Sequence, residues 1–256
     1  MKSNNEMVGM MNKNTMGTMM RIIEYNGWDN LIVEFLDEHK FKIRTTYQSF
    51  INGCVRNPYD KSIYGVGYIG EGVYSCTNTP KIYNTWNSML ARCYNPKNKN
   101  HINAYKDCKV DERFHNLQDF GLWFDENYYE VGNERMTLDK DILYKGNKIY
   151  SPDTCIFTPI RINNLFGNNS IRRGEYLKGV TFCKRAQKYM ARCWIIDENN
   201  NRKNIGLGYY ETEIEAFNAY KTFKEQYIKI VAKEYYGKIP ERLFNALIRY
   251  KIDIND

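Results

Sequence analysis

A stretch of strict alternation over residues 187–195 constrains most strongly what this chain can fold into. Residues at every second position of an extended strand lie on the same face. One face would be cationic and aromatic and the other mostly apolar: Lys188, Met190, Arg192 and Trp194 on the first, and Tyr189, Ala191, Cys193 and Ile195 on the second. A turn at 197–201 and a second strand follow, and then a helix with small residues at Ala216 and Ala219. We therefore expect the Tyr189 face to pack on that helix and the Lys188 face to stay open.

The open face has the side-chain types that a DNA-reading sheet needs. Cations bind phosphates, and forked or flat side chains contact base edges in a groove. The alternation alone is equally compatible with a small α+β domain whose outer face is simply solvated.

The residues around this strand resemble the Apetala-two/ethylene-response-factor DNA-binding domain. The matching positions are Gly179-Val180, Tyr189-Met190-Ala191-Arg192, Leu207-Gly208-Tyr209, Thr212, Glu215-Ala216 and Ala219-Tyr220. The resemblance implies a three-stranded sheet that enters the major groove and is braced by one helix. The reading residues it implies are Lys188, Met190, Arg192 and Trp194, with Lys184 and Arg185 at the strand entrance. The family usually has Trp or Phe at the place of Tyr189 and often a charged residue at the place of Trp194, so no base preference is carried over.

Composition places the chain among folded, moderately basic proteins. Its 256 residues suffice for two or three small domains, and 43% of them are hydrophobic. The net charge of +7 favours nucleic acid or another anionic partner. The seven cysteines are odd in number and form no CxxC pair, which favours a reduced, cytoplasmic setting over a disulfide framework. No membrane-spanning run and no secretory signal are evident, so we expect no membrane partner.

The order of patterns along the chain predicts a multi-domain α+β protein. Residues 1–17 should be a flexible arm, and 18–78 a small barrel-like β module with a turn at Asn26-Gly27. Residues 79–165 should form a middle unit with helices near 81–93 and 114–127. Residues 166–176 are typical of a polar linker, whose Arg172 and Arg173 would contact phosphates. The sheet-plus-helix domain spans 177–236, and Pro240 opens a C-terminal helix within 237–256.

The middle unit resembles the phage-encoded HNH-type endonucleases of the ββα-metal superfamily. The matching features are Trp86, Met89-Leu90, Arg92-Cys93-Tyr94, Tyr105, Val110, Phe114, Phe120, Trp123, Leu138-Asp139-Lys140-Asp141, Gly146-Asn147 and Tyr150-Ser151-Pro152-Asp153-Thr154-Cys155. Joined to a C-terminal DNA-reading domain, this layout resembles the free-standing endonucleases of phages and mobile elements.

Such enzymes need a general base, normally His, and a metal ion, usually Mg²⁺, beside the phosphate that they cut. In active members a His stands at the end of the strand that here ends in Asp139-Lys140-Asp141. The chain has three histidines, His39, His101 and His115, and none of them occupies that place.

Two interpretations of the missing His remain. In the first, Asp139 or Asp141 holds Mg²⁺, Lys140 contacts the phosphate, and Asn163 or Asn164 completes the ligand set, so that Asp139, Lys140 and Asp141 are the catalytic candidates. In the second, the nuclease site has decayed and the fold only binds. The two aspartates would then have an ordinary turn or capping role near Gly146.

Three functional hypotheses follow from these patterns. The first is a phage or mobile-element protein that binds specific sequences of double-stranded DNA and hydrolyses phosphodiester bonds with a metal. The second is a catalytically inactive DNA- or protein-binding factor, such as a regulator or an inhibitor of a host defence complex, acting in the host cytoplasm. The third is an RNA-binding protein, since an open sheet face can also stack unpaired bases.

Overall fold

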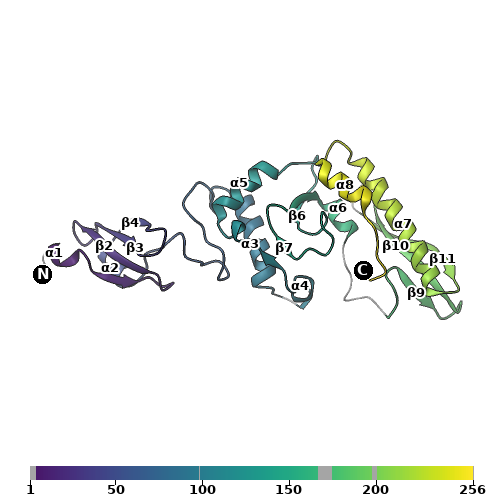
Figure 1. Ribbon diagram of the computed structural model, residues 1–256, viewed down its shortest axis with the longest axis horizontal. Helices are drawn as coiled ribbons and strands as arrows, with labels where there is room; N and C mark the ends of the chain where they lie inside the picture. Colours follow the sequence, from purple (N-terminus) through teal and green to yellow (C-terminus); the bar gives the residue numbers. More distant parts are fainter. Residues whose placement is uncertain (1–3, 98, 167–174, 198–200, 256) are drawn as a thin grey trace. The chain divides into compact units, whose positions relative to one another are not determined.

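The computed structural model describes residues 4–97, 99–166, 175–197 and 201–255 (Figure 1). Within them the chain is α+β and divides into two compact units, Met1–Asp125 and Glu126–Asp256. The division falls inside residues 79–165, a range that the sequence patterns suggest as one unit. None of the described helices is both long and apolar enough to cross a bilayer.

The first unit begins with a four-stranded antiparallel sheet. Its strands, paired in chain order, are β1 (Met11–Lys13), β2 (Met19–Tyr25), β3 (Leu31–Phe35) and β4 (Lys42–Thr45), flanked by α1 (Asn4–Met7) and α2 (Tyr47–Ile51). Alternation along β2 and β3 buries one apolar face against Phe50 of α2, as expected of strands with period two. The turn predicted at Asn26-Gly27 joins these two strands.

Two expectations for this sheet were wrong. Residues 11–13, expected in a flexible arm, form β1 because their backbone groups pair with β2, and pairing of that kind needs no side-chain pattern. The next residue, Asn14, is buried and donates from Nδ2 to Oδ2 of Asp60 at 2.6 Å. The four described strands also form an open sheet, with β1 and β4 at its edges, rather than the expected barrel-like closure.

Helices make up most of the regular structure in the rest of the first unit. Its elements are α3 (Pro80–Tyr94), α4 (Lys99–Ala104), β5 (Lys109–Val110), the 3₁₀ turn η1 (Glu112–Phe114) and α5 (Leu117–Asn127). Trp86 of α3 is fully buried and donates from Nε1 to the carbonyl of Phe114 at 2.7 Å, so the core role expected for it is confirmed. Gln118 of α5 bonds both backbone groups of Tyr74 and thereby holds the glycine-rich segment before α3.

The second unit begins with a strand, a loop, a strand and a helix. β6 (Met136–Asp139) pairs antiparallel with β8 (Ile156–Pro159), β7 (Ile149–Tyr150) lies in the loop between them, and α6 (Ile160–Leu165) starts directly after β8. Ile156 and Ile162 share one apolar core with α7 (Glu213–Glu234) and α8 (Glu241–Arg249). Because these elements share one core, they group into a compact unit distinct from the one that contains α3 and most of α5.

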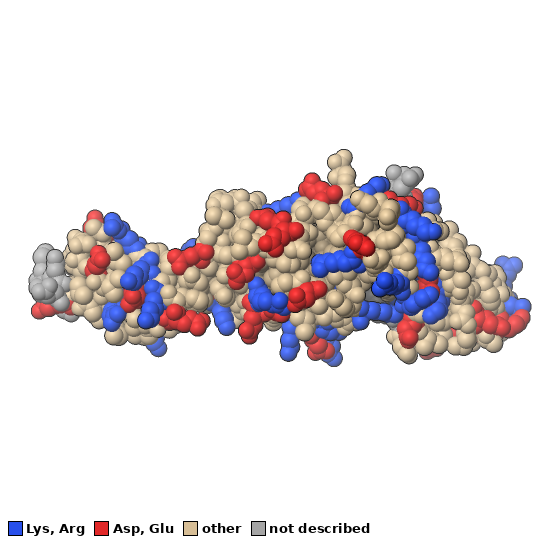
Figure 2. Space-filling model, turned by 45° about the horizontal axis from the view of Figure 1, so that its top comes forward, with Lys and Arg blue, Asp and Glu red and all other residues tan. Residues whose placement is uncertain are grey.

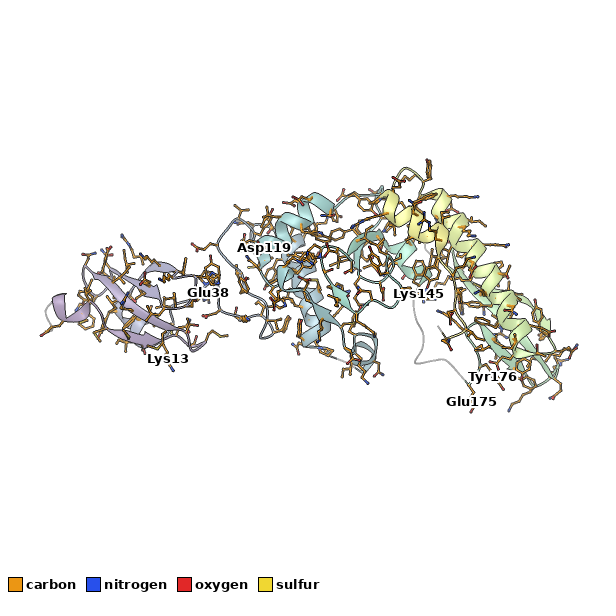
Figure 3. All side chains as sticks on the ribbon, in the orientation of Figure 1. Lys13, Glu38, Asp119, Lys145, Glu175 and Tyr176 are labelled. Atoms are coloured by element: carbon orange, nitrogen blue, oxygen red, sulfur yellow. The ribbon has the colours of Figure 1, made fainter. Side chains whose placement is uncertain are left out.

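A three-stranded antiparallel sheet packs on α7 at the end of the chain (Figures 1 and 3). Its strands are β9 (Val180–Cys183), β10 (Lys188–Ile196) and β11 (Arg202–Tyr210), with β10 in the centre. The start of α7 is fixed by a capping box between Thr212 and Glu215. Gly179 has a φ of +78°, and a Cβ there would lie 2.2 Å from the ring of Tyr220, so only glycine allows this close approach.

The alternation of β10 is confirmed along most of the strand but not at its end. Ala191 and Cys193 are buried against α7, whereas Ile195 is only half-buried and Ile196 is buried instead. The reason is tertiary. Tyr227 of α7 accepts from the amide of Ile196 at 2.8 Å, and Arg161 of α6 donates to its carbonyl, so two helices enclose the end of the strand.

Candidate nucleic-acid interface

The pairing register of β10 defines which residues share the face opposite α7. Directly paired residues of antiparallel strands lie on the same side of a sheet. Met190 pairs with Thr181 of β9 and Tyr209 of β11, and Trp194 pairs with Asn204. We call this surface the open face: Thr181, Lys188, Met190, Arg192, Trp194, Asn204, Gly206 and Tyr209.

Two aromatic rings on the open face lie in solvent. Trp194 is 56% exposed and Tyr209 is 54% exposed, and they come from neighbouring strands. Large exposed aromatic side chains that gather on one surface usually mark a place of contact with another molecule. Tyr209 was missing from the sequence-based set because a bulge shifts the register of β11 between the partners of Ala191 and Arg192, and no residue pattern marks its position.

Arg192 stands at the centre of the open face. Its amide donates to the carbonyl of Gly179 at 2.8 Å, which fixes the backbone, while its side chain is exposed. The residue paired with it is Gly206, and a Cβ there would meet nothing within 4 Å, so the neighbouring surface is flat and accessible. Within the described part of the chain, the Arg192 guanidinium has no ion-pair partner. It is therefore available for a fork-like contact with a base edge or a phosphate.

The other cations expected to contact DNA lie at the strand entrance. Lys184 and Arg185 are exposed in the turn between β9 and β10, where Gln187 adopts a φ of 54°. Lys188 has a partner within the domain, since its Nζ lies 2.5 Å from Oε1 of Glu211. Both groups are exposed, and an exposed pair of this kind is weak enough for a phosphate to compete with it.

Arg172 and Arg173, expected to contact phosphates from the linker, lie outside the described residues. The remaining candidates lie at the end of β6, in the loop that follows it and on α6: Asp139, Lys140, Asp141 and Asn163. Asp139 ends β6, and its Oδ1 accepts the amides of Asp141 at 2.9 Å and Ile142 at 2.8 Å. These two bonds close a tight turn at the strand end. This is the turn or capping role that the second interpretation of the sequence gives to Asp139.

Lys140 is buried rather than presented to solvent. Only 7% of its surface is exposed, and its Nζ donates to Oδ2 of Asp141 at 2.9 Å and to the carbonyl of Asn147 at 3.1 Å. Asn147 donates back to the carbonyl of Lys140 at 2.7 Å. The ammonium therefore ties the two sides of the loop together, as a buried charge requires hydrogen-bond partners.

The two aspartates are electrostatically linked. Burial, and after it the nearby charge of Asp141, raises the pKa of the Asp139 carboxyl to about 6. Repulsion between neighbouring carboxylates is relieved by a cation, so the donor chemistry of this pair fits a hard divalent ion, although the ammonium of Lys140 already occupies one oxygen of Asp141. Asn163, the third expected ligand, is half-buried on α6. Across the described residues no three His, Cys, Asp or Glu side chains gather as a metal-binding group.

Comparison with known proteins gives no family for this chain. No family model matches it, and no curated protein and no solved structure matches it either.

Proposed function

We propose that this protein binds double-stranded DNA by placing the open face of the sheet β9–β10–β11 in a groove. The observation that carries the proposal is that Arg192, Trp194 and Tyr209 are exposed on one face of a sheet whose other face is packed on α7. A major groove about 12 Å wide admits a small sheet, whose strands lie about 4.8 Å apart.

Each part of the surface suits a different part of the duplex. Arg192 would contact a base edge, most favourably the two acceptors of guanine. Trp194 and Tyr209 offer apolar surface for methyl groups and sugars. Lys184 and Arg185 at the rim would contact phosphates, which position the sheet without reading sequence.

Competition binding with a matched control tests this proposal. Labelled duplex is titrated with wild type, Arg192→Gln and Lys233→Gln, a variant that removes one exposed charge from α7. We expect Arg192→Gln to weaken binding of the preferred duplex by about 10- to 100-fold and Lys233→Gln by about twofold or less. Equal affinities of the three proteins would refute the proposal. Preference for single-stranded RNA would favour the RNA-binding hypothesis, and co-purification of a host protein that survives nuclease treatment would favour a protein-binding factor.

Metal-dependent hydrolysis of the bound DNA is a second candidate function. It is favoured by the repelling pair Asp139 and Asp141 at the end of β6 and by the order strand, loop, strand, helix from β6 to α6. Asp139, Asp141 and Asn163 would hold Mg²⁺, which when bound would neutralise charge on the phosphate and lower the pKa of water. Lys140 would keep the loop closed through Asp141 and Asn147.

Parallel incubations with Mg²⁺, Mn²⁺ and EDTA test the hydrolysis. Cleavage that requires metal and is lost in Asp139→Ala and Asp141→Ala, with folding and duplex binding retained, would establish it. Binding without cleavage under every metal condition would leave the loop with a structural role and favour the inactive DNA- or protein-binding factor.

A further inference from the structure

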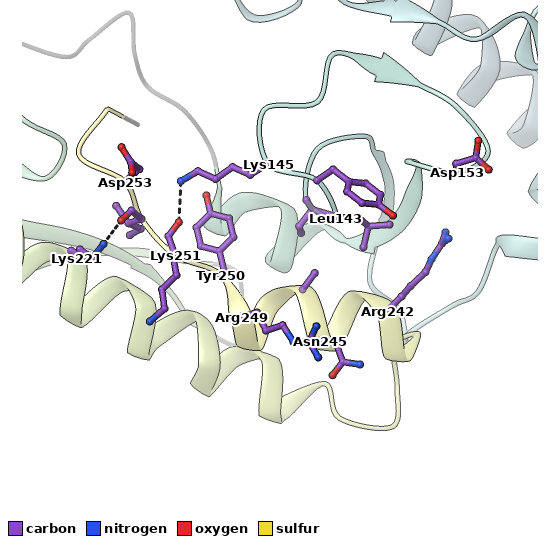
Figure 4. A pocket seen from close by; sticks show the side chains of 14 residues that line it. Leu143, Lys145, Asp153, Lys221, Arg242, Asn245, Arg249, Tyr250, Lys251 and Asp253 are labelled. Carbon is purple, nitrogen blue, oxygen red and sulfur yellow. Dashed lines mark hydrogen bonds between the residues drawn. The ribbon is translucent and has the colours of Figure 1, made fainter.

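A cationic cleft lies in the second unit, and none of its lining residues belongs to the open face. It has a volume of about 660 Å³ and is lined by the loop after β6, by α8, by the segment that follows α8 and by one residue of α7 (Figure 4). Five of its lining residues are cations and two are carboxylates: Lys145, Lys221, Arg242, Arg249 and Lys251 against Asp153 and Asp253. On the face drawn in Figure 2, Lys and Arg side chains gather over the part of the chain that α7 and α8 occupy in Figure 1.

Two of the lysines are held in place by neutral acceptors. Lys145 donates from Nζ to the carbonyl of Lys251 at 2.9 Å, and the same ammonium lies 5.5 Å from the ring centre of Tyr250. Lys221 donates to the carbonyl of Ile252, and Figure 4 draws both bonds. A carbonyl fixes the position of an ammonium without cancelling its charge. Lys221 also has a charged neighbour, since its Nζ lies 3.6 Å from Oε1 of Glu225.

Two arginines reach the cleft from one side of α8. Arg242 and Arg249 are seven residues apart, with Asn245 and Ala246 between them, a spacing that aligns side chains along one helix face. Arg242 donates from Nη2 to the carbonyl of Cys155 at 2.8 Å, again a neutral acceptor. Arg249 is exposed and has no ion pair within the described residues.

The acidic groups nearby do not balance these cations. Asp253 has its pKa lowered first by the amide of Asn255 and then by Lys145 and Lys221, so it is ionised. Glu225, beneath the C-terminal segment, lies near two of these cations: its Oε2 accepts from Nζ of Lys251 at 3.1 Å, and its Oε1 lies 3.6 Å from Nζ of Lys221. It also accepts the amide of Ile252 at 2.9 Å. Even with Glu225 included, cations outnumber carboxylates around the cleft, and a concave surface of one sign concentrates anions.

We propose that this cleft binds backbone phosphates of duplex DNA and is a second contact with DNA, independent of the open face. This inference rests on the proposed function, because it assigns duplex DNA as the ligand of the cleft too. The occupant is indicated by charge complementarity, since guanidinium forks and fixed ammonium groups in an open cleft match a run of phosphate oxygens. Such contacts would add affinity and no sequence preference.

The salt dependence of duplex binding tests this inference. The cleft variant is Arg249→Gln with Lys251→Gln, and Arg249→Gln alone serves as the milder variant because no bond of its side chain within the described residues is lost. The control, Lys229→Gln with Lys233→Gln, removes the same charge from α7 outside the cleft. We expect the slope of log affinity against log salt to fall by about 1.8 in the cleft variant and about 0.9 in the single variant. The control should keep the wild-type slope, and base preference should stay unchanged in all of them.

The outcomes separate the two proposals. Wild-type slopes in both cleft variants, with folding intact by circular dichroism, would overturn the cleft while leaving the open face in place. Absence of duplex binding by wild type would overturn both proposals. A further experiment measures thermal stability with inorganic pyrophosphate. If pyrophosphate stabilises wild type but not the cleft variant, and the cleft variant binds DNA as wild type does, the cleft binds a free phosphate compound and the proposal is wrong.

Discussion

Arg192 on β10 and Lys140 after β6 are both cations that the sequence resemblances predict to contact DNA, yet they lie in opposite surroundings. Arg192 is exposed beside a glycine, with its guanidinium unpaired within the described residues. Lys140 is buried, and Asp141 and Asn147 take up its ammonium. The open face therefore leaves the charge of Arg192 available to another molecule, whereas the β6–β8 loop uses the charge of Lys140 to hold itself together. The positive charge of a side chain therefore does not assign its function until the groups that it binds within the protein are known.

The largest expected effect comes from removing the internal charge. Lys140→Ala should lower the free energy of unfolding by about 3 kcal/mol, because Asn147 loses a donor and the packing against Tyr150 is lost. Arg192→Ala should change it by about 0.5 kcal/mol or less. Urea unfolding of both variants measures the contrast, and equal losses would mean that the two regions do not differ in the way described.

The next effect concerns pH. The pKa of Asp139 is raised from 3.8 to about 6 in the folded chain, so the folded state holds this proton more tightly than the unfolded state. Stability from this group is therefore present at low pH and is lost as the pH rises between about 4 and 6. Asp139→Asn keeps the acceptor for the two amides and should stabilise the protein by about 1 to 2 kcal/mol at pH 7 and by nothing at pH 3.5.

Melting temperatures of wild type and Asp139→Asn across pH 3.5 to 7 measure this difference. A constant difference at every pH would show that the carboxyl does not titrate in that window. Addition of Mg²⁺ gives a second reading: if the two aspartates bind the ion, Mg²⁺ should stabilise wild type and not Asp139→Asn.

A smaller effect is expected for an aromatic ring of the open face. Trp194→Ala should leave stability within about 0.5 kcal/mol of wild type and weaken duplex binding by about tenfold, because more than half of Trp194 is exposed and its ring would contact DNA. Trp28→Ala in the first unit is the control, since Trp28 is 61% exposed. Equal binding losses in the two variants would argue that neither ring contacts DNA directly.

The smallest effect tests the ion pair between Lys188 of the open face and Glu211. Glu211→Gln frees Lys188 from its partner and should raise duplex affinity by about two- to threefold, most clearly at low salt. Fluorescence anisotropy at two salt concentrations resolves a change of that size. Lower affinity in Glu211→Gln would mean that Glu211 positions Lys188 rather than competing for it.

The sequence predicts the open face and the β6–β8 loop to different extents. Alternation predicts the two faces of β10 because burial repeats with period two. The prediction departs from the structure at Ile195, which is only half-buried, because Arg161 and Tyr227 from distant helices enclose Ile196 instead. The bulge in β11 that brings Tyr209 onto the open face leaves no local signal. The cations of the cleft come from α7, α8, the segment after α8 and the β6–β8 loop, and no spacing in the chain shows that they meet.

The bonds of the β6–β8 loop were not predictable for a different reason. The partners of Lys140 are Asp141, next in sequence, and the carbonyl of Asn147, and neither contact follows from residue type. They depend on the path of a loop whose turn is set by Asp139. A family resemblance names such positions as catalytic candidates, while only geometry shows which of them already have internal partners.

The central claim is that Arg192 reads a base from the open face. Selection of bound duplexes from a randomised library, carried out in parallel with wild type and Arg192→Gln, tests it most directly. The account predicts that wild type enriches a defined sequence and that Arg192→Gln loses the preference at one position while keeping the others. An unchanged preference with uniformly weaker binding would show that Arg192 contacts only phosphate and would contradict the claim.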